Sequence, residues 1–206
     1  MSGVRARIYD AVIVHMTAGW YRAVIERLPD DCRLLDVGIG TGGALVANAS
    51  EIVRKRLRVT GVDIDRDYVR RCNRALAEAA LASQVEARCE SIYDHEGGPY
   101  DAIYFSGSFM LLPDPHAALR HVTTRLAGGG RIYFTQTFEK RRSRGMERIK
   151  PLLGLVTTID FGRVTYEADF RRALAAGGVA VEDLVALRTG RSRSAILAVG
   201  RPEGRS

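Results

Sequence analysis

The sequence predicts a single α/β domain, built on a doubly wound and mainly parallel sheet of seven strands. Apolar runs of strand length alternate with longer helical segments, and a glycine-rich loop follows the first of these runs. A short Thr-Gly-Arg turn joins the last two runs, which predicts an antiparallel strand at the sheet edge. A chain of 206 residues is long enough to bury the core of one such domain.

The segment before the first strand is expected to be helical. Apolar residues four apart, from Ile8 to Leu28, would lie along one helical face. Gly19 interrupts this stripe and Thr17 is suited to cap a helix, so we expect two short helices in place of one long one. Pro29 then begins the turn that ends the helical region.

The remaining elements follow in a regular alternation. Strands are predicted over Arg33–Val37, Leu57–Val62, Val85–Cys89, Tyr100–Phe105, Arg131–Thr137, Val179–Leu187 and Ser194–Val199. Helices are predicted over Gly43–Arg54, Asp65–Leu81, His116–Leu126 and Tyr166–Ala176. No repeat or linker divides the chain, so the 206 residues form one domain: leading helices (1–30), core (31–137), insertion (138–162), final helix and strand pair (163–200) and tail (201–206).

Composition excludes several classes of protein. Hydrophobic residues make up 46% of the chain and charged residues 27%, the balance of a soluble globular protein. No apolar stretch is long enough to span a bilayer, and no secretory signal is evident, so the cytoplasm is expected. The cysteines Cys32, Cys72 and Cys89 lack the spacing of a zinc site or disulfide framework. A net charge of +7 favours anionic partners.

The loop after the first strand, residues 36–43, has the sequence Asp-Val-Gly-Ile-Gly-Thr-Gly-Gly. Gly38, Gly40 and Gly43 satisfy the dinucleotide pattern G-x-G-x-x-G, so the glycines alone leave NAD open. Asp36 separates the alternatives, because its carboxylate would repel a pyrophosphate and attract the ammonium and sulfonium charges of S-adenosylmethionine. Asp63 ends the second strand, where an acid accepts hydrogen bonds from ribose hydroxyls in either cofactor.

These features together resemble the class I S-adenosylmethionine-dependent methyltransferases, over about residues 34–137. The loop resembles the family's first motif, and Asp63 resembles its ribose-binding acid. Glu90-Ser91 is similar to the family's adenine-binding position, although aspartate is commoner than glutamate there. The resemblance implies that the leading helices lie over the cofactor. It also implies a set of cofactor-binding residues: Asp36, Gly38, Gly40, Thr41, Gly42, Asp63, Ile64, Glu90, Ser91 and Ser106.

The methyl acceptor is less constrained. Ser106 lacks the paired prolines that follow this position in enzymes methylating base amino groups. Asp101 lacks the acidic and amide companions of a magnesium-dependent catechol methyltransferase, so no metal is expected. We therefore expect metal-independent, in-line transfer to a small molecule. The candidates for a catalytic base are His15, Tyr9, Tyr21 and His116, with none preferred.

The insertion at 138–162 carries a basic run, Lys140–Arg144, beside apolar residues. An anionic small molecule, a phospholipid surface or RNA would suit it, and so would a solvated loop. The main alternative is a peripheral-membrane phospholipid N-methyltransferase, which the chain resembles in size, basic pI and leading helix. Nucleic acid ranks lower because no added recognition domain is present. Two further alternatives are a non-catalytic cofactor-binding partner and an NAD-dependent oxidoreductase.

Overall fold

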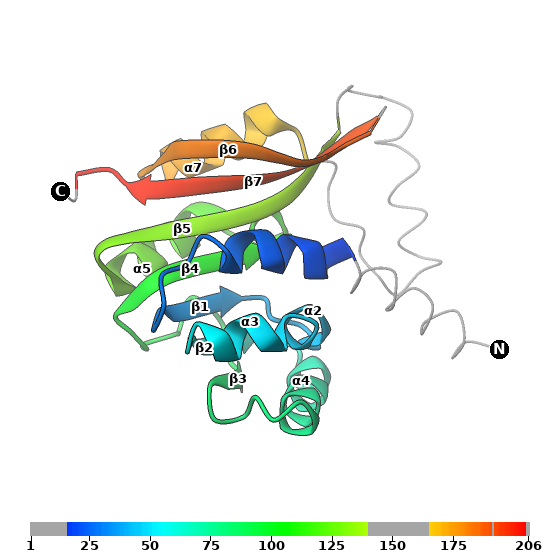
Figure 1. The fold of residues 1–206 in the computed structure, drawn as a ribbon. Coiled ribbons are helices and arrows are strands. Elements are labelled where there is room, and N and C mark those ends of the chain that lie inside the picture. The colour runs from blue at the N-terminus through cyan, green and yellow to red at the C-terminus, as the bar shows by residue number, and fades with distance from the viewer. Residues whose placement is uncertain (1–15, 140–164, 191, 205–206) are drawn as a thin grey trace.

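A computed structural model describes residues 16–139, 165–190 and 192–204. Its strands form one seven-stranded sheet in the order β3-β2-β1-β4-β5-β7-β6 (Figure 1). The first five are parallel to one another, whereas β7 runs antiparallel to both β5 and β6. The predicted fold class is therefore confirmed. The strands are β1 Arg33–Val37, β2 Arg58–Asp63, β3 Val85–Cys89, β4 Tyr100–Ser106, β5 Leu126–Glu139, β6 Val179–Thr189 and β7 Arg193–Pro202.

The strand order reverses in the middle of the sheet, and in open α/β sheets such a reversal leaves a crevice at the carboxyl ends of the strands. From β1 the chain proceeds outward through β2 and β3, and then returns to place β4 on the other side of β1. In open α/β sheets, ligands bind outside the carboxyl ends of the strands at such a reversal of order. Val37 ends β1 and Ser106 ends β4, so the loops that follow these two residues flank the crevice.

Helices cover both faces of the sheet (Figure 1). On one face, a helix over 16–25, α2 (Gly43–Val46), α3 (Ala49–Arg54) and α4 (Arg66–Glu78) share a core with β1 and β2. On the other face, α5 (Pro115–Arg125) and α7 (Glu167–Ala176) pack with the short helix η1 (Phe109–Leu111). The long strand β5 exceeds its predicted bounds at both ends and includes the glycines at 128–130.

Two helix predictions were wrong. The segment 43–54 is two helices, because Asn48 leaves the helical ladder between α2 and α3. Its buried side-chain amide donates to the carbonyl of Ala44 at 2.8 Å and to that of Ala18 at 3.0 Å. The Asn48 backbone N–H then donates to Leu45, three residues back, since the side chain takes the carbonyl four residues back.

The leading helix also differs from its prediction. It runs without a break through Gly19, and it is already formed at residue 16, so Thr17 does not cap a second helix. A glycine inside a helix costs about 1 kcal/mol relative to alanine. Burial of Trp20, Tyr21 and Val24 against the sheet outweighs this cost, at roughly 1.5–3 kcal/mol for each large apolar side chain. The earlier part of the leading segment, and the insertion after Glu139, lie outside the described residues.

Candidate cofactor site

The glycine loop turns sharply because three of its glycines have positive φ angles, 82° at Gly38, 59° at Gly40 and 71° at Gly42. A Cβ added at Gly42 would lie 2.5 Å from the Sγ of Cys72, so this glycine lets the loop pack on α4. At Gly40 an added Cβ would meet nothing within 4 Å. Gly40 therefore faces open space at the crevice, where a ligand can approach its backbone.

Asp63 holds this loop in place. One carboxylate oxygen accepts from the N–H of Gly40 at 3.0 Å, and the other accepts from the N–H of Asp65 at 2.9 Å. The N–H of Gly38 also donates to the carbonyl of Val62 at 2.8 Å. An ionised carboxylate has about four acceptor positions, so roughly two remain at Asp63 for hydroxyl donors. The predicted ribose-binding acid thus also supports the loop beside it.

Asp36 is completely buried at the end of β1. The hydroxyl of Tyr21, from the leading helix, donates to its Oδ2 at 2.6 Å, whereas its Oδ1 has no hydrogen-bond partner among the described residues. Burial raises the pKa of Asp36 to about 7; the hydrogen bond from Tyr21 opposes this rise and the charge of Asp63 adds to it. A buried carboxyl with an unpaired oxygen is costly, and an ammonium group or another donor would offset that cost.

Apolar and acidic groups lie beside Asp63. Ile64 is 78% exposed, the largest exposed fraction among the exposed large hydrophobic residues of the described chain. The N–H of Glu90, after β3, donates to the carbonyl of Asp63 at 3.1 Å, which brings the ends of β2 and β3 together. The hydroxyl of Ser91 accepts from the N–H of Tyr93 at 3.2 Å and so supports its own turn. An adenine ring needs such an apolar surface beside a polar edge.

The structure thus brings most of the predicted cofactor residues to one edge of the sheet. Thr41 and Ser106 are partly buried at the ends of the loop and of β4. Sequence reasoning missed Ser108, whose hydroxyl donates to the carbonyl of Val37 and whose Cβ would be 2.7 Å from a Cβ at Gly38. It also missed His95, which contacts Glu90. A serine and a histidine in loops carry no sequence pattern that would have identified them.

The structure describes two of the four candidates for a catalytic base, Tyr21 and His116. Tyr9 and His15 lie outside the described residues. Burial raises the pKa of Tyr21 well above that of an ordinary phenol, so Tyr21 serves as a hydrogen-bond donor to Asp36. The Nδ1 of His116 lies 3.1 Å from the carbonyl of Ala173 in α7, to which it donates. With Nδ1 donating, the Nε2 of a neutral His116 ring is an acceptor, so His116 stays a candidate base, whereas the Tyr21 hydroxyl is engaged with Asp36.

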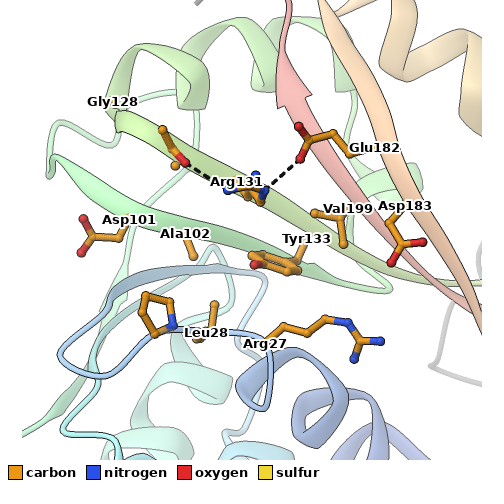
Figure 2. Close-up of a pocket in the computed structure, with 13 residues that line it drawn as sticks. Arg27, Leu28, Asp101, Ala102, Gly128, Arg131, Tyr133, Glu182, Asp183 and Val199 are labelled. Atoms are coloured by element: carbon orange, nitrogen blue, oxygen red, sulfur yellow. Dashed lines mark hydrogen bonds and ion pairs between the residues drawn. The ribbon is translucent and has the colours of Figure 1, made fainter. Parts of the chain in front are cut away.

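A separate hollow of about 500 Å³ lies at the opposite, amino-terminal edge of the strands (Figure 2). Its lining includes Asp101 at the start of β4, together with Arg131, Tyr133 and Glu182. Arg131 pairs with Glu182 at 2.8 Å, and Asp101 with Arg33 at 2.8 Å. Because the glycine loop is at the other edge of the sheet, this hollow is not part of the cofactor site.

The described residues contain neither a metal-binding cluster nor a membrane-spanning helix, and their cysteines are unpaired. In residues 16–139, 165–190 and 192–204, no cluster of three or more His, Cys, Asp or Glu side chains is arranged to hold a metal ion. The same ranges contain no helix long and apolar enough to cross a membrane. The three cysteines are free thiols, buried at Cys32 and Cys72 and exposed at Cys89.

Comparison with known proteins agrees with this geometry. Residues 35–132 match the model of a family described as a methyltransferase domain. The [4+2]-cyclase SpnF has the same fold, with a TM-score of 0.73 and 17% identity over 92% of this chain and 81% of its own. Geranyl diphosphate C-methyltransferase from Streptomyces coelicolor, solved with Mg²⁺, geranyl diphosphate and S-adenosylhomocysteine, gives 0.70 and 18% identity over 93% and 77%. The mitomycin 7-O-methyltransferase MmcR gives 0.70 and 16% identity over 96% of this chain and 58% of its own.

Proposed function

We propose that this chain is a class I S-adenosylmethionine-dependent methyltransferase, which transfers a methyl group to a small organic molecule by in-line displacement. The observation that carries the proposal is the pairing, at one crevice, of an open glycine loop with a buried carboxyl that has one unpaired oxygen. When bound, S-adenosylmethionine supplies a methyl group on positively charged sulfur, which is already activated for transfer. The protein then contributes mainly binding and orientation.

Each part of the proposed cofactor site has a distinct task. Asp36 favours the positively charged end of the cofactor, because a nearby cation offsets the cost of burying its carboxylate. Asp63 retains acceptor positions for the ribose hydroxyls while it holds Gly40. Ile64 offers an exposed apolar surface to the adenine ring, and Glu90 an acceptor for its amino group. Gly38, Thr41, Gly42, Ser91 and Ser106 complete the proposed set.

The same features argue against a nicotinamide cofactor. A pyrophosphate near the loop would face the carboxyl group of Asp36, whose pKa the nearby charge of Asp63 also raises, although Asp63 itself would suit the ribose of either cofactor. Repulsion between anions weakens binding, whereas an ammonium relieves the mutual repulsion of these two acids. We therefore expect the protein to bind S-adenosylhomocysteine and to bind NAD far more weakly.

A small molecule is the proposed acceptor. Enzymes of this fold named for geranyl diphosphate and for mitomycin support this choice of class. The basic run Lys140–Arg144 would attract an anionic acceptor, although it lies outside the described residues. A phospholipid acceptor is the alternative that this run also suits. A transfer that needs no metal is proposed because the sulfonium is already activated, and His116, whose Nε2 is an acceptor when Nδ1 donates, is the described candidate for a base.

Calorimetry tests the cofactor assignment. We expect Asp63→Ala to weaken S-adenosylhomocysteine binding by about 1.5–3 kcal/mol through lost charge-assisted hydrogen bonds. Asp65→Ala is the matched control, since Asp65 caps α4 through the N–H groups of Asp67 and Tyr68. It should lower the stability of the protein by about 1 kcal/mol and leave cofactor affinity near that of the parent. Unchanged affinity in Asp63→Ala, or equally tight NAD binding, would remove the assignment.

Turnover tests the acceptor. S-adenosylmethionine with a labelled methyl group is incubated with a panel of small acceptors, neutral and anionic, and separately with anionic phospholipid vesicles. We expect label in small molecules, together with an equal amount of S-adenosylhomocysteine. Label confined to the vesicles would support the phospholipid alternative. Tight cofactor binding without label in any acceptor would instead support a non-catalytic partner.

A further inference from the structure

His95, in the loop between β3 and β4, is fully buried, and both of its ring nitrogens have partners. Its Nδ1 lies 2.6 Å from Oε1 of Glu90, and its Nε2 lies 2.8 Å from the hydroxyl of Tyr100. An ionised carboxylate only accepts hydrogen bonds, so Nδ1 carries the proton. The Nε2 of a neutral ring then accepts from the Tyr100 hydroxyl. The three side chains form one directed chain of hydrogen bonds that ends at Glu90.

The surroundings fix this ring in place. The Nε2 of His121, in α5, donates to the backbone carbonyl of His95 at 2.7 Å. The ring stacks on Tyr100 with centroids 5.7 Å apart. A Cβ at Gly97 would be 2.6 Å from the His95 Nε2 and 2.5 Å from the Tyr100 hydroxyl, so the loop backbone closes tightly over both rings. The imidazole is therefore a rigid support for the carboxylate that it contacts.

The position of Glu90 distinguishes this arrangement from an ordinary buried histidine. Most buried histidines with two partners only satisfy the core around them. Here the partner carboxylate stands at the ligand edge, because the N–H of Glu90 is bonded to the carbonyl of Asp63. The Glu90 side chain keeps 30% of its surface exposed, and its contact with His95 uses only Oε1. Oε2 is left for a donor from outside this chain.

We infer that His95 is a positioning residue that orients Glu90 toward the amino group of adenine, and so sets the purine specificity of the cofactor site. The inference rests on the proposed function, since it needs an adenine cofactor at this edge. Without this contact, ligand binding would restrict the rotamers of a flexible glutamate, and the lost side-chain entropy would offset part of the hydrogen bond's contribution to affinity. The contact with a rigid imidazole removes that cost before the ligand arrives.

Two substitutions of His95 separate positioning from simple core packing. The amide nitrogen of asparagine overlays Nδ1 of histidine, so His95→Asn keeps the donor to Glu90. The amide nitrogen of glutamine overlays Nε2, so His95→Gln keeps a polar group at Tyr100 and removes that donor. The readout is the ratio of affinities for S-adenosylhomocysteine and for its analogue whose purine lacks the 6-amino group. A purely structural role would weaken both ligands alike.

We expect the parent to prefer S-adenosylhomocysteine by about tenfold or more, the size of one hydrogen bond to a charged group. His95→Asn should retain most of this preference, whereas His95→Gln should lose most of it, as should Glu90→Ala. If Glu90→Ala loses the preference and His95→Gln keeps it, the inference is wrong while the proposed function stands. If Glu90→Ala keeps it, Glu90 does not recognise the amino group and the inference is also wrong. A parent that binds neither ligand contradicts the proposed function itself.

A measurement on the unaltered protein covers the case in which a His95 variant does not fold. The ¹⁵N resonance of the His95 Nδ1 reports its hydrogen bond to Glu90. We expect S-adenosylhomocysteine to shift this resonance more than the analogue without the amino group does, because only the former draws on the same carboxylate. Equal shifts from the two ligands would overturn the inference.

Discussion

Substitution of Asp36 by asparagine is the most direct test of the site. Burial raises the pKa of Asp36 from 3.8 to about 7, a rise of about 3 units. At about 1.36 kcal/mol per unit, the folded protein holds this proton more tightly than the unfolded chain by about 4 kcal/mol. Asparagine has nearly the same shape and cannot ionise. The variant should therefore lack a large pH-dependent contribution to stability.

The direction of this dependence follows from proton binding. Between pH 4 and 7 the folded state binds the proton of Asp36 and the unfolded state does not, so stability decreases as pH rises through this range. Acids with lowered pKa values, such as Asp31 and Asp101 beside their arginines, act in the opposite direction. The difference between variant and parent cancels these other groups. From pH 4 to pH 7, we expect the unfolding free energy of Asp36→Asn to rise relative to that of the parent by up to about 4 kcal/mol.

Urea unfolding at pH 4, 5, 6, 7 and 8 measures that difference. Tyr21→Phe is the matched control, because the hydrogen bond from Tyr21 lowers the pKa of Asp36 and its loss should move the dependence to higher pH. S-adenosylhomocysteine should release a proton on binding near pH 7, since its ammonium favours the ionised carboxyl. Calorimetry in buffers of different ionisation enthalpy detects the proton. Parallel stability curves for Asp36→Asn and the parent would refute the reasoning, as would binding without proton release.

Three other substitutions test the loop and the first helices. Gly40→Ala places alanine at a positive φ, which costs about 1–2 kcal/mol of strain but causes no clash in the protein. Thermal melting with and without S-adenosylhomocysteine measures both the loss of stability and the loss of cofactor affinity. A loss of affinity larger than the strain would place the ligand beside this Cβ. Gly42→Ala should lower the unfolding free energy by about 2–4 kcal/mol through strain and overlap with Cys72, and Cys72→Ala should restore part of it. Asn48→Ala should cost about 1–3 kcal/mol in denaturant unfolding, because the buried hydrogen bond to the Ala44 carbonyl and the partly buried one to the Ala18 carbonyl both lose their donor.

The sequence was sufficient to predict the sheet and the shared edge of the site. Five parallel strands place their carboxyl ends together, so acids that follow two neighbouring strands must lie near each other. Asp36 in β1 and Asp63 at the end of β2 illustrate this, since the charge of one raises the pKa of the other. This inference needed only strand direction and order, which the alternation of apolar runs indicates.

Most of the missed features depend on contacts between residues that are distant in the chain. Asn48 breaks a helix because its amide also reaches Ala18, 30 residues away in the chain. Gly19 stays helical because its neighbours pack on the sheet. Tyr21 reaches Asp36 across 15 residues, and no periodicity in either segment indicates that pairing. Local propensity predicted each of these positions reasonably in isolation, and tertiary packing decided otherwise.

The energetic cost in this domain is concentrated where a cofactor would relieve it. Three features meet at the end of β1: a buried carboxyl with an unpaired oxygen, the nearby charge of Asp63, which raises the pKa of that carboxyl, and a loop with three glycines at positive φ. Elsewhere the described acids are mostly paired, as Asp101 is with Arg33. A ligand with an ammonium group would offset the first two costs at once, so its binding energy would add directly to folding stability. The rest of the domain must supply the stability that such a site lacks. The buried aromatic residues Phe105, Phe134 and Phe170, which pack together on the opposite face of the sheet, contribute to it.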